Sequence, residues 1–149
     1  SFGGMLAGNE HTINFAYNTS RTWLLSAAFP PAVAAANIKA LEIVENEKER
    51  VEKLWENRDY FKKEMESIGF NTGMSETPIV PAMIGDSKKA KEFSQRLYEE
   101  GIFGLAIVYP MVERGKARIR NQLNAGLSKD DINKALRAYE KIGKELNVI

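Results

Sequence analysis

The 149-residue sequence contains no cysteine and a single histidine, His11. The lack of cysteine excludes disulfides, thiolate metal sites and a cysteine nucleophile, and one histidine cannot build a zinc site by itself, so no metal site is expected. His11 lies in a polar stretch and is predicted to be exposed or to cap a helix. The absence of cysteine is compatible with a reducing compartment, so the expected location is cytoplasmic.

The sequence also lacks a large net charge, because its 21 basic residues nearly balance its 20 acidic ones. Without a net field, neither nucleic acid nor an anionic membrane is an expected partner. No stretch approaches the roughly 20 apolar residues of a membrane-spanning helix. The sequence also has no G-x-S-x-G turn and no glycine-rich phosphate-binding motif. A self-contained hydrolase and a nucleotide-binding protein are therefore both unexpected.

The first half of the chain changes character near residue 30. Residues 1–28 are punctuated by glycine and have no consistent 3.6-residue period, which favours short strands and turns. Pro31 then begins a region that predicts two long helices, or one kinked helix, as far as Ile68. Its second part places six apolar residues on one helical face: Val51, Leu54, Trp55, Phe61, Met65 and Ile68.

The second half of the chain mixes strands and helices. Residues 78–84 predict a strand, and Pro81 places it at an edge or a bulge because proline cannot donate a ladder hydrogen bond. A helix follows as far as Gly101, and residues 102–109 predict a buried strand. Residues 117–123 then alternate in hydrophobicity, which predicts a further strand.

The last helix is predicted to begin after Ser128, which forms a capping box with Asp131. The order from residue 78 is strand, helix, strand, strand, helix. We therefore expect an α/β chain of the α+β type, with a small, mostly antiparallel sheet of about three strands and helices packed on one side.

The alternating strand places Arg118 and Arg120 on one face and Ile119 on the other. A strand holds both guanidinium groups rigidly, and the planar fork of each matches a carboxylate through two parallel hydrogen bonds. A carboxylate site is one interpretation. The other is an exposed strand face on which each arginine makes a surface ion pair that contributes little. The spacing alone leaves both interpretations open.

Three segments carry a family resemblance: GKARIRNQLNAGLS at residues 115–128, TPIVPAMIGD at 77–86, and SRTWLLSAAFPPAVAAA at 20–36. Together they resemble the C-terminal part of the pyridoxal-phosphate (PLP) dependent α-oxoamine synthases. Among these they are most similar to glycine C-acetyltransferase, also called 2-amino-3-ketobutyrate CoA ligase. The resemblance implies the C-terminal domain of fold-type I PLP enzymes. It assigns residues 1–28 to a remnant of the large PLP-binding domain and its linker, and residues 29–149 to the small domain.

The resemblance also implies roles for individual residues. Arg120 matches the arginine that binds the substrate carboxylate, and Arg118 is left with a structural role. Ser26 and Ala27 match a pair that reaches the cofactor phosphate of the neighbouring subunit, although Ala27 has no hydroxyl. The lysine that forms the Schiff base with PLP would directly precede residue 1, so we expect no catalytic residue in these 149 residues.

The activity implied by the resemblance is that of a transferase. It condenses glycine or a similar amino acid with an acyl-CoA to give a 2-amino-3-oxo acid, as a cytoplasmic homodimer with PLP as cofactor. We expect the 149 residues alone to be an inactive fragment. One alternative is a non-catalytic, excised or engineered α/β module that folds or self-associates. Another is a carboxylate-binding module that uses the arginine face.

Overall fold

The computed structural model of the chain describes residues 4–27 and 29–149. It divides into two compact units, an N-terminal unit that ends at Lys48 and a C-terminal unit, Glu49–Ile149. Within the described residues, every helix is too short or too polar to span a bilayer. The expected domain division between residues 28 and 29 stays a prediction.

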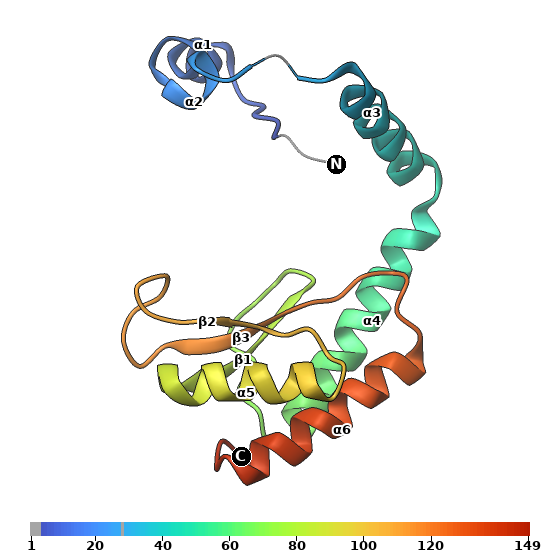
Figure 1. Cartoon of the computed structure of the whole chain (residues 1–149). Helices are drawn as coiled ribbons and strands as arrows, with labels where there is room; N and C mark the ends of the chain where they lie inside the picture. Colours follow the sequence, from blue (N-terminus) through green and yellow to red (C-terminus); the bar gives the residue numbers. More distant parts are fainter. Residues whose placement is uncertain (1–3, 28) are drawn as a thin grey trace. The chain divides into compact units, whose positions relative to one another are not determined.

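The N-terminal unit begins with two helices, α1 (Glu10–Thr19) and α2 (Arg21–Leu24) (Figure 1). The expectation of short strands in this region is therefore wrong. Capping decides the outcome instead of apolar periodicity. The Asn9 side chain caps α1 by accepting a hydrogen bond from the Thr12 N–H at 2.9 Å. The Ser20 hydroxyl caps α2 in the same way, by accepting from the Trp23 N–H at 3.4 Å.

Two long helices follow, α3 (Pro31–Asn46) and α4 (Lys48–Ser67), which confirms the predicted helical region. The apolar face of α4 is buried only towards its C-terminal end. Phe61 and Met65 are almost inaccessible, whereas the Trp55 side chain is 38% exposed. The periodicity located the helix correctly, and the fold decided how much of its face is covered.

A three-stranded sheet forms the centre of the C-terminal unit. It contains β1 (Ile79–Gly85), β2 (Leu105–Ile107) and β3 (Ala117–Gln122) in the order β1-β3-β2, and both pairings are antiparallel. Pro81 lies on an edge strand that also carries a register shift near its C-terminal end. Both features agree with the prediction for this strand.

The second strand differs from its prediction. Residues 102–109 were expected to form a buried strand, but only Leu105–Ile107 pair with β3, and Leu105 is 49% exposed. The physical reason is that β2 has a neighbour on one side only and that helices cover one face of the sheet only. An apolar run by itself does not distinguish an edge strand with an open face from a buried strand.

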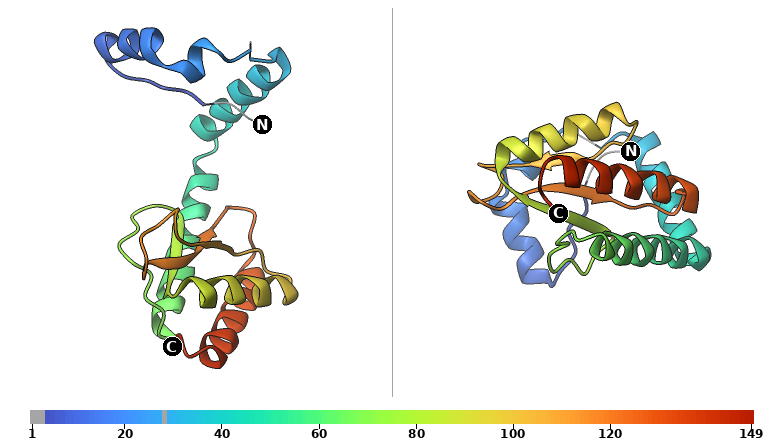
Figure 2. Two further views of the ribbon diagram at one scale, coloured as in Figure 1. Left: turned by 60° about the vertical axis from the view of Figure 1, so that its left-hand side comes forward. Right: turned by 90° about the horizontal axis from the view of Figure 1, so that it is seen from below.

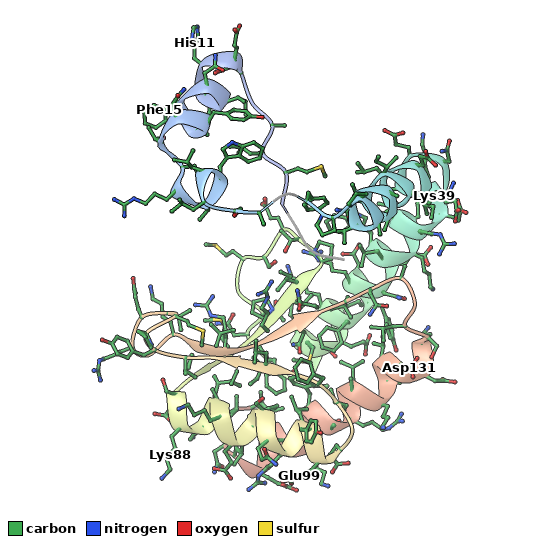
Figure 3. The ribbon with its side chains drawn as sticks, turned by 45° about the horizontal axis from the view of Figure 1, so that its top comes forward. His11, Phe15, Lys39, Lys88, Glu99 and Asp131 are labelled. Carbon is green, nitrogen blue, oxygen red and sulfur yellow. The ribbon has the colours of Figure 1, made fainter. Side chains whose placement is uncertain are left out.

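Three helices cover one face of the sheet. The view from below in Figure 2 shows α5 (Ser87–Glu99) and α6 (Lys129–Glu145) beside α4, all in front of the strands. The predicted capping box is confirmed, since the Ser128 and Asp131 side chains each accept the other's backbone N–H. Asp131 lies at the start of α6 in Figure 3. The predicted α+β fold, with helices on one side of a three-stranded antiparallel sheet, is confirmed.

The core lies between the sheet and these helices. Tyr139 of α6 stands at its centre and contacts three phenylalanine rings, with centroids 6.0 Å from Phe61, 5.6 Å from Phe70 and 5.3 Å from Phe93. All four side chains are 3% exposed or less. This aromatic cluster fixes the helices against the covered face of the sheet, and the opposite face stays open.

Candidate functional site

The open face of the sheet presents the predicted site. Ile119 of β3 is fully buried on the covered face, so its neighbours Arg118 and Arg120 project from the other side. Arg120 lies opposite Pro81 on one side and Leu105 on the other. Strand β3 is therefore held by hydrogen-bonded partners along both edges, which fixes the root of the Arg120 side chain.

The two arginines differ in their partners. Arg118 Nε donates a hydrogen bond to the Lys116 carbonyl at 3.1 Å, and its structural role stays a prediction. Among the described residues, the Arg120 guanidinium has neither a hydrogen-bond acceptor nor a carboxylate within ion-pair distance. The interpretation in which surface ion pairs occupy both arginines is not realised in this part of the chain. Arg120 has all its donors available for a ligand.

Strand β3 is anchored from beneath by a buried polar contact. The Tyr139 hydroxyl donates to Asn121 Oδ1 at 2.5 Å, and burial raises the pKa of Tyr139 far above its usual value. The phenol therefore stays neutral and remains a donor. In the described structure Asn121 Nδ2 is buried without an acceptor, which adds a cost to this position. The contact fixes the residue next to Arg120 in the strand.

Sequence reasoning missed Asn57, which fixes the loop after β3. Its Nδ2 atom donates to the carbonyls of Asn124 and Leu127, both at 3.0 Å. Asn57 is 3% exposed and shares a face of α4 with Phe61 and Met65. A polar residue in register with an apolar stripe was the available signal.

The second predicted site lies in the N-terminal unit, just after α2. The Ser26 hydroxyl donates to the Thr22 carbonyl within its own turn, and Ala27 adds no hydroxyl. The backbone N–H groups of Ser26 and Ala27 have no acceptor within the described residues. These two N–H groups are the donors that the segment offers to a phosphate, and the contact with PLP stays a prediction. Ser26 and Ala27 belong to one unit and Arg120 to the other.

A hollow of about 530 Å³ lies beside the Tyr109 loop. Its lining includes two cationic side chains, Lys91 and Arg114, which no sequence motif marked. The Arg114 guanidinium lies 4.5 Å from the centre of the Tyr109 ring, within cation–π range. This hollow is part of the C-terminal unit and is lined by the start of α5.

Two further predictions concern the chemistry of the chain. His11 is exposed near the start of α1 and its side chain points away from the helix in Figure 3. Asn9, and not His11, is the N-cap of α1. Across residues 4–27 and 29–149, no three side chains of the metal-binding kinds lie close enough to hold an ion.

Comparison with known proteins identifies the family of this chain. The family described as aminotransferase class I and II matches residues 1–138. This match covers most of the sequence, and the chain therefore belongs to the aminotransferase class I and II family.

The most similar relatives narrow the comparison. The 8-amino-7-oxononanoate synthase of Symbiobacterium thermophilum is 48% identical over 147 residues, which cover 99% of this chain and 38% of that enzyme. A Thermus thermophilus enzyme named 8-amino-7-oxononanoate synthase/2-amino-3-ketobutyrate coenzyme A ligase is also 48% identical, over 99% of this chain and 37% of its own length. The chain thus spans somewhat more than a third of these relatives. Within the family, its similarity is to a C-terminal portion of α-oxoamine synthases, as expected. Among them, 8-amino-7-oxononanoate synthase is favoured over glycine C-acetyltransferase.

A solved structure supports the fold. The serine palmitoyltransferase of Sphingomonas wittichii superimposes with a TM-score of 0.80 at 22% identity, over 95% of this chain and 36% of that one. Other solved SPT structures of this fold contain PLP. At such low identity the likeness concerns the fold alone.

Proposed function

We propose that the chain supplies the carboxylate-binding part of a PLP-dependent α-oxoamine synthase, and more specifically of an 8-amino-7-oxononanoate synthase acting on alanine and pimeloyl-CoA. The observation that carries the proposal is the unpartnered guanidinium of Arg120 on a strand that is hydrogen-bonded along both edges. The similarity of the chain to enzymes of that name supports it.

In this proposal Arg120 orients the amino-acid substrate. Its fork donates two parallel hydrogen bonds to the α-carboxylate and fixes the plane of that group. The strand has few ways to move, because Ile119 is fully buried behind it and Asn121 is bonded to Tyr139. A rigid support of this kind keeps the reacting carbon in one place, which is how binding energy lowers the cost of bringing two substrates together.

PLP, when bound, supplies the electron sink for the negative charge that develops at the amino-acid Cα. The residues of this chain that would contact it are Ser26 and Ala27, whose free backbone N–H groups suit a phosphate oxygen. For the Ser26 hydroxyl to donate as well, it would have to leave the Thr22 carbonyl. The proposed assembly is a homodimer in which this segment reaches the cofactor of the neighbouring subunit.

Glycine C-acetyltransferase, which uses glycine and acetyl-CoA, is the second candidate. It is supported by the second name of the Thermus thermophilus relative. The two candidates share the carboxylate step at Arg120 and differ in the acyl donor and in the substituent on the amino-acid Cα. The cytoplasmic location stays a prediction.

The direct test is an assay of the protein that contains these residues, supplied with PLP. We expect release of free CoA from alanine with pimeloyl-CoA at a higher kcat/KM than from glycine with acetyl-CoA. The opposite ranking would favour the second candidate. No CoA release with either pair would refute the proposal and favour a non-catalytic module.

The role of Arg120 has its own test in the same assay. Arg120→Lys keeps the charge but loses the bidentate fork, so KM for the amino acid should rise about tenfold or more. Arg137 of α6 is also exposed and serves as the matched control. Arg137→Lys should leave KM unchanged. An unchanged KM in Arg120→Lys would remove Arg120 from the site.

A further inference from the structure

Three cross-strand neighbours form the middle of the open face. Arg120 stands between Pro81 of β1 and Leu105 of β2, each directly opposite it in register. Directly opposed side chains in an antiparallel pair have Cβ atoms about 4.5–5.5 Å apart. The Arg120 guanidinium therefore leaves the sheet between two apolar side chains, neither of which offers it a hydrogen-bond acceptor.

The two sides of Arg120 are covered to different extents. On the β1 side the chain around Gly73 lies close, since a Cβ added to Gly73 would be 3.6 Å from Pro81 Cγ and 3.9 Å from Met83 Sδ. The Asn71 carbonyl also accepts the Met83 N–H at 2.9 Å. On the β2 side, Leu105 remains 49% exposed. A ligand at Arg120 therefore has more room above Leu105 than above Pro81.

We infer that Leu105 contacts the aliphatic part of the carboxylate ligand held by Arg120, and that it selects a methyl substituent over a hydroxymethyl substituent on that ligand. The inference rests on the proposed function, because it takes Arg120 as the carboxylate-binding residue. It adds a specificity-determining residue on a second strand.

The selectivity follows from the chemistry of the Leu105 side chain. Each methylene or methyl group buried against it should tighten binding about three- to fourfold. A hydroxymethyl group placed there would bring its hydroxyl against a side chain that has no polar atom to pair with it. An enclosed hydrophobic pocket disfavours an added hydroxyl by about a hundredfold at most, and beside the half-exposed Leu105 the preference should be smaller.

The names of the similar proteins show why this distinction matters. The name 8-amino-7-oxononanoate describes a chain of nine carbons with its amine on carbon 8. The terminal carbon 9, next to the amine-bearing carbon, is therefore a methyl group. The structural relative named serine palmitoyltransferase takes its name from serine, whose substituent is hydroxymethyl. Leu105 is the residue of this chain that would favour the first substituent over the second.

The test uses the 149-residue chain with ¹⁵N-labelled arginine, and follows the Arg120 Nε–Hε signal by NMR. The signal is assigned with Arg120→Lys. Titration with acetate, propionate and butyrate should show binding that tightens about three- to fourfold at each step. L-Alanine should bind more tightly than L-serine.

Two variants isolate the contribution of Leu105. Leu105→Ala should remove the dependence on chain length and bring alanine and serine to equal affinity, with acetate bound as before. Leu41 of α3 has the same 49% exposure and lies in the other unit, so Leu41→Ala is the matched control and should behave as the unsubstituted chain.

The outcomes separate the inference from the proposed function. If acetate leaves the Arg120 signal unmoved, the carboxylate role of Arg120 fails and the inference falls with it. If acetate binds but butyrate binds no more tightly, only the role of Leu105 is refuted. If Leu105→Ala still binds longer carboxylates more tightly, the role of Leu105 is likewise refuted and the role of Arg120 stands.

Discussion

Both units of the chain contain helices, but the two units bury them very differently. In α1, α2 and α3 no residue is buried, and the Phe15 and Trp23 side chains are 70% and 59% exposed. In the C-terminal unit, six residues of α6 alone are buried, and Tyr139 lies in an aromatic cluster. The sequence thus forms helices both with and without a buried core.

The comparison shows what each kind of signal can achieve. An N-cap side chain such as that of Asn9 or Ser20 stabilises the first turn of a helix and needs no tertiary partner. Such helices are marginal in water unless an apolar face is covered. In the C-terminal unit the helices bury their own apolar faces against the sheet. The same unit provides the rigid strand that carries Arg120. The unit with the core is therefore the one able to hold a side chain in fixed geometry.

The largest expected difference between the units comes from deleting one aromatic ring in each. Phe93→Ala removes a fully buried ring and should lower the free energy of unfolding by about 3–5 kcal/mol. Phe15→Ala should change it by less than about 0.5 kcal/mol. Urea unfolding followed by circular dichroism measures both. Equal losses would show that the N-terminal unit has a core of its own.

Glycine positions give the next largest contrast. A Cβ at Gly104 would lie 2.9 Å from side-chain atoms of both Ile119 and Leu97, so Gly104→Ala should cost about 1–3 kcal/mol of unfolding free energy. At Gly8 the nearest atoms are 3.8 Å away, in Thr12, and Gly8→Ala should be tolerated. Thermal melts of the two variants compare them directly. A stable Gly104→Ala would mean that α5 can move away from β3 at little cost.

Helix caps should sharpen the comparison with a smaller effect. Ser128→Ala removes the capping box of α6 and should cost about 1 kcal/mol in the cooperative unfolding transition. Asn9→Ala removes the cap of α1 and should lower the helical signal at 222 nm without moving that transition. A shift of the main transition by Asn9→Ala would contradict the separation of the two units.

The smallest effect is a pH dependence at the surface. Lys141 Nζ of α6 lies 2.7 Å from Glu100 at the end of α5, and this hydrogen bond lowers the pKa of Glu100 below its usual 4.5. A depressed carboxyl pKa contributes stability that is present above the ordinary pKa and is lost as the pH falls through the folded value. Below pH 4.5 the link between α5 and α6 should therefore weaken.

A carboxyl ¹³C NMR titration tests this link. Lys141→Met should return the Glu100 pKa towards 4.5. Lys144→Met removes a lysine of the same helix that pairs with Glu140 instead, and should leave Glu100 unchanged. In the N-terminal unit, by contrast, Lys39 pairs with Glu42 inside α3, so that pair joins no separate elements.

The fold of the C-terminal unit was largely predictable, because its signals are local and agree with one another. The alternation around Ile119 located β3, Pro81 marked an edge strand, and the Ser128 capping box marked the start of α6. Helices α1 and α2 were missed because residues 1–28 show no consistent 3.6-residue period, whereas α3, which buries no residue either, was predicted. The only signals of α1 and α2 were the caps Asn9 and Ser20.

The sequence by itself determined that Arg118 and Arg120 share one strand face, because side chains alternate along any strand. The structure showed that Arg118 commits its Nε–H to the Lys116 carbonyl two residues away, whereas no donor of Arg120 has an acceptor among the described residues. Only the tertiary structure decided that Leu105 lies opposite Arg120, because strand register depends on chain segments distant in sequence. The carboxylate site thus combines a local rule with a non-local pairing.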